Sequence, residues 1–199
     1  MSAPAVHQAA SLLLYYPDQD WPGRLDAVAA QLRATRHPAA GPLLRFCSEA
    51  ARVPVLDAAA HYTDVFDRTH RRTLHLTYYT DGDTRRRGGA LVALREVYRA
   101  AGWEPDPAEL PDHLPLMLEF AARCPRAGTR LLRGHRAGIE LLRLALEAHG
   151  TRYAHVLDAV SATLPGPRPA DRAAARRLAR TGPPTEHVGL EPFAARPPS

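Results

Sequence analysis

The chain has 199 residues, of which 45% are hydrophobic, so it can bury one ordinary core and is most simply one domain with an appendage. All 26 basic residues are arginines, and with 21 acidic residues the net charge is +5, which permits contact with nucleic acid or an anionic membrane without predicting it. The two cysteines are far apart in the sequence, which argues against a disulfide framework or a CxxC site. No segment has the roughly 18 consecutive apolar residues of a membrane span. We therefore expect a cytoplasmic protein.

The first third of the chain predicts four short helices. Apolar residues recur in them at intervals of three and four, which is the spacing of one helix face. The segments lie around residues 9–16, 22–32, 43–50 and 55–66. Prolines separate them, at Pro17, Pro22, Pro42 and Pro54, because proline ends a helix or occupies its first turn.

The stretch from residue 61 to residue 88 interrupts this helical pattern. Leu74, Leu76 and Tyr78 alternate with polar residues at the two-residue period of a strand. No second segment shows a comparable pattern, and a lone strand cannot satisfy its own backbone. The stretch is therefore either a connector packed against helices or the working part of the molecule.

A helix is expected after this stretch, with Asp83 as its N-cap and Gly102 at its end. It carries Leu91, Leu94 and Tyr98 on one face. The pair 88–89 inside it consists of two glycines, each of which costs about 1 kcal/mol relative to alanine. Either another segment approaches closely there, or the helix starts later.

Three more helices are predicted in the second half. The first begins at Pro111 and is apolar nearly all round, so we expect it to be the central helix. Its main apolar stripe is Leu114, Met117, Leu118 and Ala121. A longer helix follows over residues 132–146, and another lies over residues 153–164.

The composition changes after residue 164. Eight of the nineteen prolines lie between residues 165 and 199, where large apolar residues are few and arginines gather around residues 172–180. We therefore expect a helical domain over residues 1–164 and a disordered tail over residues 165–199, with at most one short helix in it.

Motifs for catalysis or metal binding are missing. The densest histidine group is His61, His70 and His75, which lacks the HxxxH and HExxH spacings of helical metal sites. The run from Arg85 to Gly89 lacks the spacing of a phosphate loop, and no local signature of a catalytic triad is present. The sequence therefore predicts no metal, no cofactor and no enzymatic activity.

Three segments in a fixed order resemble one known family. They are YTDVFDRTHRRTLHLTYYTDGDTRRRG from residue 62, ALVALREVYRAAGWE from residue 90 and ELPDHLPLMLEFAA from residue 109. Together they are similar to the NarJ-type nitrate reductase assembly chaperones, a branch of the TorD/DmsD/NarJ family of redox-enzyme maturation proteins. The likeness covers residues 62–122, and the N-terminal sequence LLLYYPD fits the opening of the family.

The resemblance implies an all-α fold, a single compact multi-helix domain, and a chaperone instead of an enzyme. Such proteins bind the N-terminal segment of an apo molybdoenzyme subunit and hold it ready for insertion of the molybdenum cofactor before it docks on the membrane. The implied partner is the apo catalytic (alpha) subunit of respiratory nitrate reductase, with cofactor-delivery proteins as further candidates. The resemblance also implies that the strand-like stretch is a connector beside the peptide-binding surface.

The residues of this stretch independently suit a peptide site. Large aromatic side chains with few rotatable bonds, together with carboxylates, fit a groove for a basic amphipathic helix. The candidates are Tyr62, Asp64, Phe66, Asp67, Tyr78 and Tyr79, with Asp81 and Asp83 as weaker members. The alternative is that the aromatic residues belong to the core and the aspartates cap helices and form turns.

The segment Glu109–His113 resembles the E-P-x-D-H signature of the wider family, with its proline shifted by one place. Asp112 has a structural alternative, because an acidic residue in the first turn of a helix can accept backbone hydrogen bonds. His113 is the better candidate for contacting a ligand, since capping does not require it.

A basic helical nucleic-acid-binding protein is the competing hypothesis for the whole chain, and only the arginine content favours it.

Overall fold

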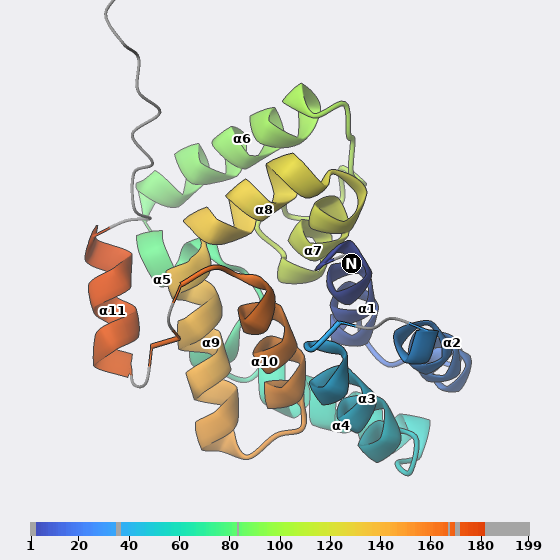
Figure 1. Ribbon diagram of the computed structural model, residues 1–199. Coiled ribbons are helices and arrows are strands. Elements are labelled where there is room, and N and C mark those ends of the chain that lie inside the picture. Colours follow the sequence, from blue (N-terminus) through green and yellow to red (C-terminus); the bar gives the residue numbers. More distant parts are fainter. Residues whose placement is uncertain (1–2, 35–36, 83, 167, 170–171, 182–199) are drawn as a thin grey trace, which may run out of the picture.

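The structure is a computed structural model that describes residues 3–34, 37–82, 84–166, 168–169 and 172–181. These residues fold into helices (Figure 1), as the sequence predicts. The helices are α1 (Ala3–Leu14), α2 (Trp21–Ala34), α3 (Ala40–Ala50), α4 (Val55–Phe66), the 3-10 turn η1 (His70–Arg72), α5 (Thr77–Asp81), α6 (Arg85–Ala100), α7 (Leu114–Arg123), α8 (Pro125–Gly134), α9 (Arg136–His149), α10 (Tyr153–Thr163) and α11 (Arg172–Thr181). The first four lie where proline and periodicity place them, and the connection between α6 and α7 runs over residues 101–113.

Helix α7 is the central helix, as expected from its all-round apolar sequence. Seven of its ten residues are buried, and α1, α8 and the connector before α5 surround it. The hydroxyl of Ser11 in α1 donates to the carbonyl of Pro115 at 2.8 Å. On the other side, a Cβ at Gly128 of α8 would lie 2.2 Å from the Cα of Ala121, so only glycine allows these two backbones to pack so closely.

The expected start of α7 is wrong. Helix α7 begins at Leu114 instead of Pro111, because residues 112–114 pair in extended form with residues 74–76. The amide of Leu76 donates to the carbonyl of Asp112 at 3.0 Å, and the amide of Leu114 donates to the carbonyl of Leu74 at 2.8 Å. The strand-like stretch is thus a connector whose backbone is satisfied by one antiparallel bridge, and residue 77 already begins α5.

The long helix expected over residues 132–146 is also wrong, because it is two helices that meet at His135. The backbone of His135 leaves the helical region, with φ −99° and ψ 12°. Gly134 precedes the break and favours it, since glycine has a low helix propensity. The two halves pack on different neighbours: α8 covers α7, whereas α9 contacts α5, α10 and α11.

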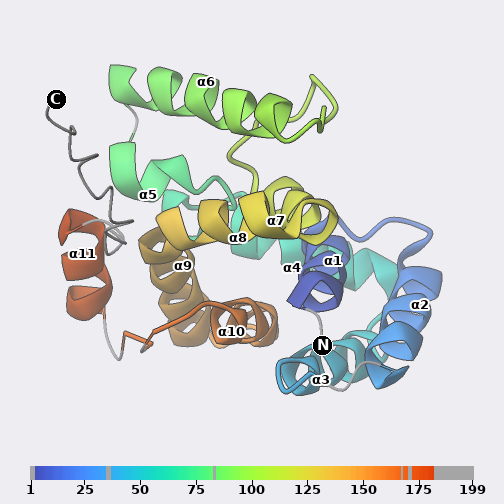
Figure 2. The same ribbon diagram turned by 45° about the horizontal axis from the view of Figure 1, so that its top comes forward.

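Helix α6 is held to the domain by few side chains. Only Leu94 and Tyr98 of its sixteen residues are buried, and the Tyr98 hydroxyl donates to the carbonyl of Pro111 at 2.6 Å. Figure 2 shows α6 lying along the outer side of α7 and α8. The expected N-cap Asp83 lies outside the described residues. The helix includes the glycines at 88 and 89, and a Cβ there would meet nothing within 4 Å, so neither a close approach nor a later start explains them.

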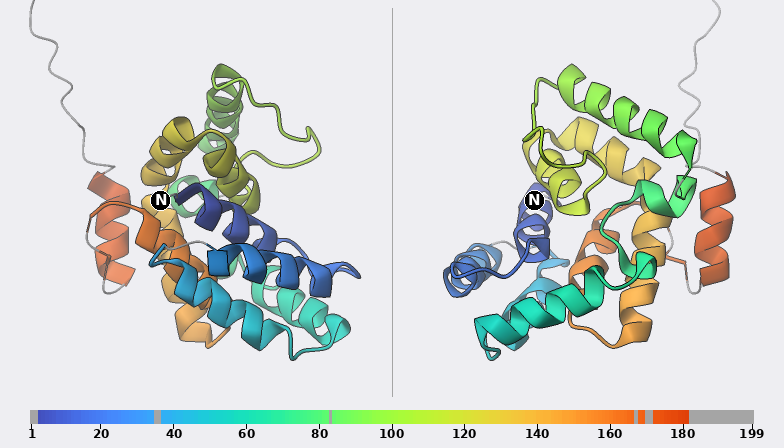
Figure 3. Two further views of the ribbon diagram at one scale, coloured as in Figure 1. Left: turned by 45° about the vertical axis from the view of Figure 1, so that its right-hand side comes forward. Right: turned by 180° about the vertical axis from the view of Figure 1, so that it is seen from behind.

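The short helix expected in the tail is α11, which packs along the outer side of α9 (Figure 3). Ala175 of α11 is fully buried. Two arginines of α9 hold the chain between α10 and α11: Arg136 donates to the carbonyl of Gly166 at 3.0 Å, and Arg143 donates to that of Pro169 at 3.2 Å. Residues 182–199 lie outside the described part, and the domain boundary at residue 164 stays a prediction.

Candidate functional site

The predicted site residues fall into three places in the fold. Tyr62 and Phe66 lie in the core, and Asp64 and Asp67 lie on the surface beside them. Asp112 and His113 lie in a polar cluster between α5, α6 and α7, and Tyr78 and Tyr79 line a cavity beside η1 and α11. The structure therefore does not bring the predicted residues together into one groove.

Tyr62 and Phe66 take the core position that was the alternative for them. Their rings lie 4.8 Å apart, and the ring of Phe66 meets that of Tyr153 at 4.9 Å. The Tyr62 hydroxyl donates to the carbonyl of Leu14 at 3.0 Å, which satisfies it internally. Both residues are more than nine-tenths buried, so their location supports a stabilising role more than contact with a partner.

The two aspartates of α4 stand at its exposed end. The Asp64 carboxylate pairs with Arg68 at 3.2 Å and with His149 at 3.7 Å. Asp67 is exposed at the C-cap position of α4, where its amide donates to the carbonyl of Thr63. Neither aspartate lines either of the two cavities described below.

Asp112 is the centre of a buried polar cluster that the sequence does not predict. Its side chain is fully buried and accepts hydrogen bonds from the His75 Nδ1 at 2.9 Å, the Thr77 hydroxyl at 2.5 Å and the Arg87 Nη2 at 3.3 Å. The Arg87 Nε also donates to the Thr77 hydroxyl at 3.1 Å. The cluster therefore ties the start of α6 to the connector before α5 and to the connector before α7.

Electrostatics keep the Asp112 carboxyl ionised. Burial alone would favour its neutral form, but the hydrogen bonds from His75 and Thr77 and the positive charge of Arg87 outweigh burial and lower its pKa to about 2. The capping role that was the structural alternative for Asp112 is not seen, because α7 starts two residues later and its N-cap position is held by His113 without a side-chain cap. Asp112 instead joins three segments of the chain.

His113 borders this cluster and is mostly covered. Its ring packs edge to face with that of Tyr15, with centroids 6.0 Å apart, and its Nδ1 lies 3.7 Å from Glu109. Burial, with the nearby His75, lowers the pKa of His113 to about 4. The ring is therefore neutral at physiological pH, with one-fifth of the side chain still exposed.

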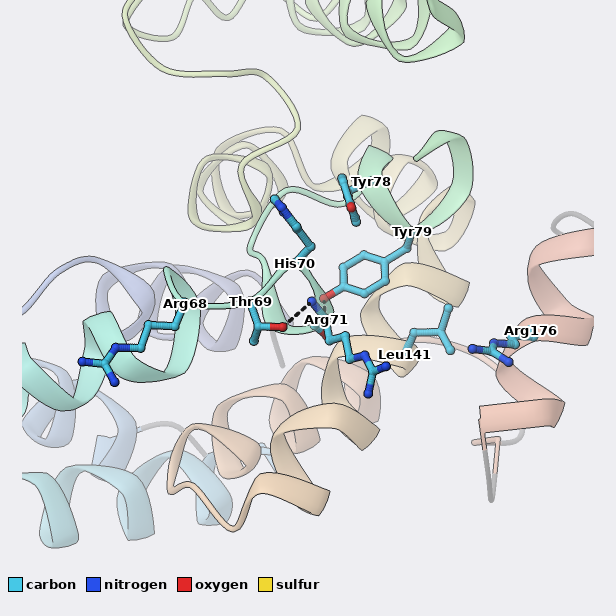
Figure 4. Close-up of a pocket in the computed structure, with 8 residues that line it drawn as sticks. All are labelled: Arg68, Thr69, His70, Arg71, Tyr78, Tyr79, Leu141 and Arg176. Atoms are coloured by element: carbon cyan, nitrogen blue, oxygen red, sulfur yellow. Dashed lines mark hydrogen bonds between the residues drawn. The ribbon is translucent and has the colours of Figure 1, made fainter. Parts of the chain in front are cut away.

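Tyr78 and Tyr79 of α5 line a cavity of about 550 Å³, whose lining residues Figure 4 shows. The other lining residues are Arg68, Thr69, His70, Arg71, Leu141 and Arg176. No carboxylate is among the described residues that line it, although the sequence suggested an acidic groove here. The cavity is therefore cationic and aromatic, and its chemistry is opposite to that expectation.

A second hollow, of about 530 Å³, lies between α6 and α8 and is mostly apolar. It is lined by Val97, Ala100, Ala101, Ala127, Arg130, Leu131, Gly134 and His135. The sequence does not predict it, because nothing in the expected helices indicates that α6 packs beside α8. The available signal was Val97, an apolar residue of α6 that lies beside the expected core face and not within it, and that is 38% exposed.

Among the residues that the structure describes, no three His, Cys, Asp or Glu side chains are placed to hold a metal ion. The described part of the chain also contains no helix with the length and apolar character needed to cross a membrane.

Comparison with known proteins places the chain in a family. Residues 28–159 match the family described as nitrate reductase delta subunit. The nitrate reductase-like protein NarX of Mycobacterium tuberculosis is 44% identical over 79% of this chain, but this chain spans only 24% of NarX. NarJ of Bacillus subtilis is 32% identical and is covered over 86% of its length.

Two further comparisons agree. NarJ of Escherichia coli, a nitrate reductase molybdenum cofactor assembly chaperone, is 34% identical over 74% of this chain and 64% of its own. A crystal structure described as a redox enzyme maturation protein from Archaeoglobus fulgidus has the same fold, with a TM-score of 0.63 over 82% of this chain and 94% of that chain at 21% identity. The chain therefore belongs to the nitrate reductase delta subunit family, in its NarJ-type branch.

Proposed function

We propose that this chain is an assembly chaperone that binds the N-terminal region of the apo catalytic (alpha) subunit of a respiratory nitrate reductase. It holds this subunit in the cytoplasm, ready for insertion of the molybdenum cofactor, before the complex docks on the membrane. The names of its NarJ relatives support a chaperone role instead of a catalytic one. The single structural observation that carries the proposal is the apolar hollow between α6 and α8.

The hollow suits one face of a helix. Its floor consists of small and apolar side chains. They include Val97 of α6, Ala101 at the end of α6, and Ala127 and Leu131 of α8. Small residues let a partner backbone approach, and apolar side chains of the partner would be removed from water there. Because α6 buries only Leu94 and Tyr98, its C-terminal half can adjust to the width of a bound segment.

The charges of the hollow indicate which charge the bound segment should carry. Arg130 is the one permanently charged residue among the described residues that line it. Burial lowers the pKa of His135 below its usual value, which favours the neutral ring. We therefore infer that the bound segment is amphipathic and carries a carboxylate near Arg130. Asp64 and Asp67, from which a basic segment was expected, lie at α4, at the opposite end of the molecule from α6 (Figures 1 and 3).

Calorimetric titration with a synthetic peptide of the alpha-subunit N-terminus tests the binding site. Val97→Asp places a charge in the apolar floor and should weaken binding by roughly tenfold or more, as for a buried interface anchor. Leu56→Asp is the matched control, because Leu56 is also an exposed apolar helix residue, 81% accessible, on the distant α4. Equal affinities of both variants and the native chain would place the peptide elsewhere.

The assembly step needs its own measurement. Alpha subunit purified from cells that lack this chain should contain little molybdenum, and re-expression of the native chain should restore it. Val97→Asp should restore less molybdenum than Leu56→Asp. If the alpha subunit is fully loaded without this chain, the proposed role in cofactor insertion is wrong even where the peptide binds.

A further inference from the structure

We propose that the cavity between η1, α5, α9 and α11 is a binding site for the phosphate group of a small organic molecule. It is separate from the hollow between α6 and α8, with which it shares no lining residue. Its lining contains Arg68, His70 and Arg71 from one turn and Arg176 from α11, and no carboxylate among the described residues. The volume of about 550 Å³ is that of an ordinary small-molecule site.

The arginines of the cavity differ in whether the protein already neutralises them. Arg68 pairs with Asp64 at 3.2 Å and is largely exposed. Arg72, which does not line the cavity, donates to the carbonyls of Val65 and Asp64 at 2.8 and 3.3 Å. For Arg71 and Arg176, by contrast, no described carboxylate lies within ion-pair distance. These two side chains therefore carry the positive charge that is open to a ligand.

Figure 4 shows the side chains of Arg71 and Arg176 on either side of Leu141. They come from η1 and α11, segments about a hundred residues apart in the sequence, and the fold brings them to one cavity. Like charges on one cavity repel each other, and an oxyanion between them would replace repulsion with charge-assisted hydrogen bonds. Guanidinium groups suit phosphate in particular, since they can donate two parallel hydrogen bonds.

The aromatic side chains of the cavity would contact the organic part of such a ligand. The rings of Tyr78 and His70 stack with centroids 5.1 Å apart. The Tyr79 hydroxyl donates to the carbonyls of Arg71 and Thr73 at 3.2 and 3.0 Å, which fixes its ring and the η1 turn together. Aromatic rings beside Leu141 offer apolar surface next to the guanidinium groups. A phosphate attached to a planar or apolar group matches both the arginines and the aromatic side chains of the cavity.

Phosphate could also come from a nucleic acid, and carboxylates from an acidic polypeptide could replace it. The cavity favours a small molecule because its lining comes from four separate segments, η1 with its preceding turn, α5, α9 and α11. An extended strand of nucleic acid needs a continuous basic track, whereas these arginines gather at one cavity. The experiment includes both alternatives.

The test is calorimetric titration of the full chain at low salt with inorganic pyrophosphate and, separately, with ADP. Both should bind, ADP more tightly because its ring adds contact with the aromatic wall. Arg71→Gln and Arg176→Gln should each weaken binding by roughly tenfold, as expected for a charge-assisted phosphate contact. Arg45→Gln is the matched control, an exposed arginine on α3 away from the cavity, and should leave both affinities unchanged.

Several results would overturn the proposal. They are the absence of pyrophosphate and ADP binding to the native chain, an equal loss in the Arg45→Gln variant, and tighter binding of a single-stranded oligonucleotide or a polyglutamate peptide than of ADP. Thermal unfolding of each variant shows whether it is folded. Binding of the alpha-subunit peptide should be unaffected by Arg71→Gln, and ADP binding should be unaffected by Val97→Asp, so failure of this site and failure of the proposed function are distinguishable.

Discussion

Helices α7 and α6 show how differently two helices of one chain can be used. Seven of the ten residues of α7 are buried, whereas α6 buries only Leu94 and Tyr98 among sixteen. Both helices meet at the buried carboxylate of Asp112, which Arg87 of α6 contacts and which lies two residues before the start of α7. The comparison separates residues that stabilise the fold from residues that are left available to a partner. Substitutions in the two helices should therefore change the free energy of unfolding by different amounts, and in one case with the opposite sign.

The largest difference is expected for an apolar truncation. Leu118 of α7 is fully buried, so Leu118→Ala should lower the free energy of unfolding by about 2–5 kcal/mol through lost burial and the remaining cavity. Val92 of α6 is 59% exposed, so Val92→Ala should change it by no more than about 0.5 kcal/mol. Chemical denaturation of both variants measures the difference. Similar losses in the two would mean that α6 is part of the core.

The next effect concerns the junction between the helices and has a defined pH dependence. The folded pKa of Asp112, about 2, is below its unfolded value of about 3.9, so the folded state binds fewer protons between these two values. The resulting stabilisation is fully present above about pH 4 and is lost as the pH falls towards 2. It amounts to about 2–3 kcal/mol at neutral pH.

Asp112→Asn should remove this contribution and flatten the pH dependence of stability below pH 4. Urea unfolding at pH 7 and at several acidic pH values measures it. Asp67→Asn serves as the control, because that carboxylate is exposed on α4 and should leave the profile as in the native chain. A native profile in Asp112→Asn would show that the hydrogen bonds of His75, Thr77 and Arg87 do not depend on the charge.

A smaller loss is expected where α8 crosses α7. Gly128→Ala would place a methyl group 2.2 Å from the Cα of Ala121, and the backbones must move apart to accept it. Such overpacking costs about 1–3 kcal/mol. Thermal unfolding should show a lower midpoint, and the double variant Gly128→Ala with Ala121→Gly should not regain native stability, because the contact is with backbone atoms. An unchanged midpoint would mean that the two helices are free to separate.

Local signals in the sequence predict much of this fold. Prolines and three-to-four spacing locate α1 to α4, and the all-round apolar sequence of residues 114–121 predicts the buried α7. The same spacing also indicates the core position of Tyr62 and Phe66. Tyr62 and Phe66 are four residues apart, on the same helix face as Ala58 and Ala59, and a face with that pattern is turned towards the core.

Other features could not be predicted because they depend on contacts distant in sequence. Asp112 and Arg87 are 25 residues apart, and nothing local connects them. The delayed start of α7 follows from the bridge between residues 75 and 113, which replaces the first helical turn with extended backbone. The cationic cavity needs Arg71 and Arg176 together, and only the packing of α11 on α9 provides this.

The smallest effect in the comparison should have the opposite sign. Gly89 lies within α6, and a Cβ there would meet nothing within 4 Å. Alanine has a higher helix propensity and loses less backbone freedom on folding, so Gly89→Ala should raise the free energy of unfolding by about 0.5–1 kcal/mol. It should leave the affinity for the alpha-subunit peptide unchanged, because Gly89 does not line the hollow between α6 and α8. A loss of peptide affinity in a stabilised Gly89→Ala variant would show that binding requires a flexible start of α6 and not only the apolar floor.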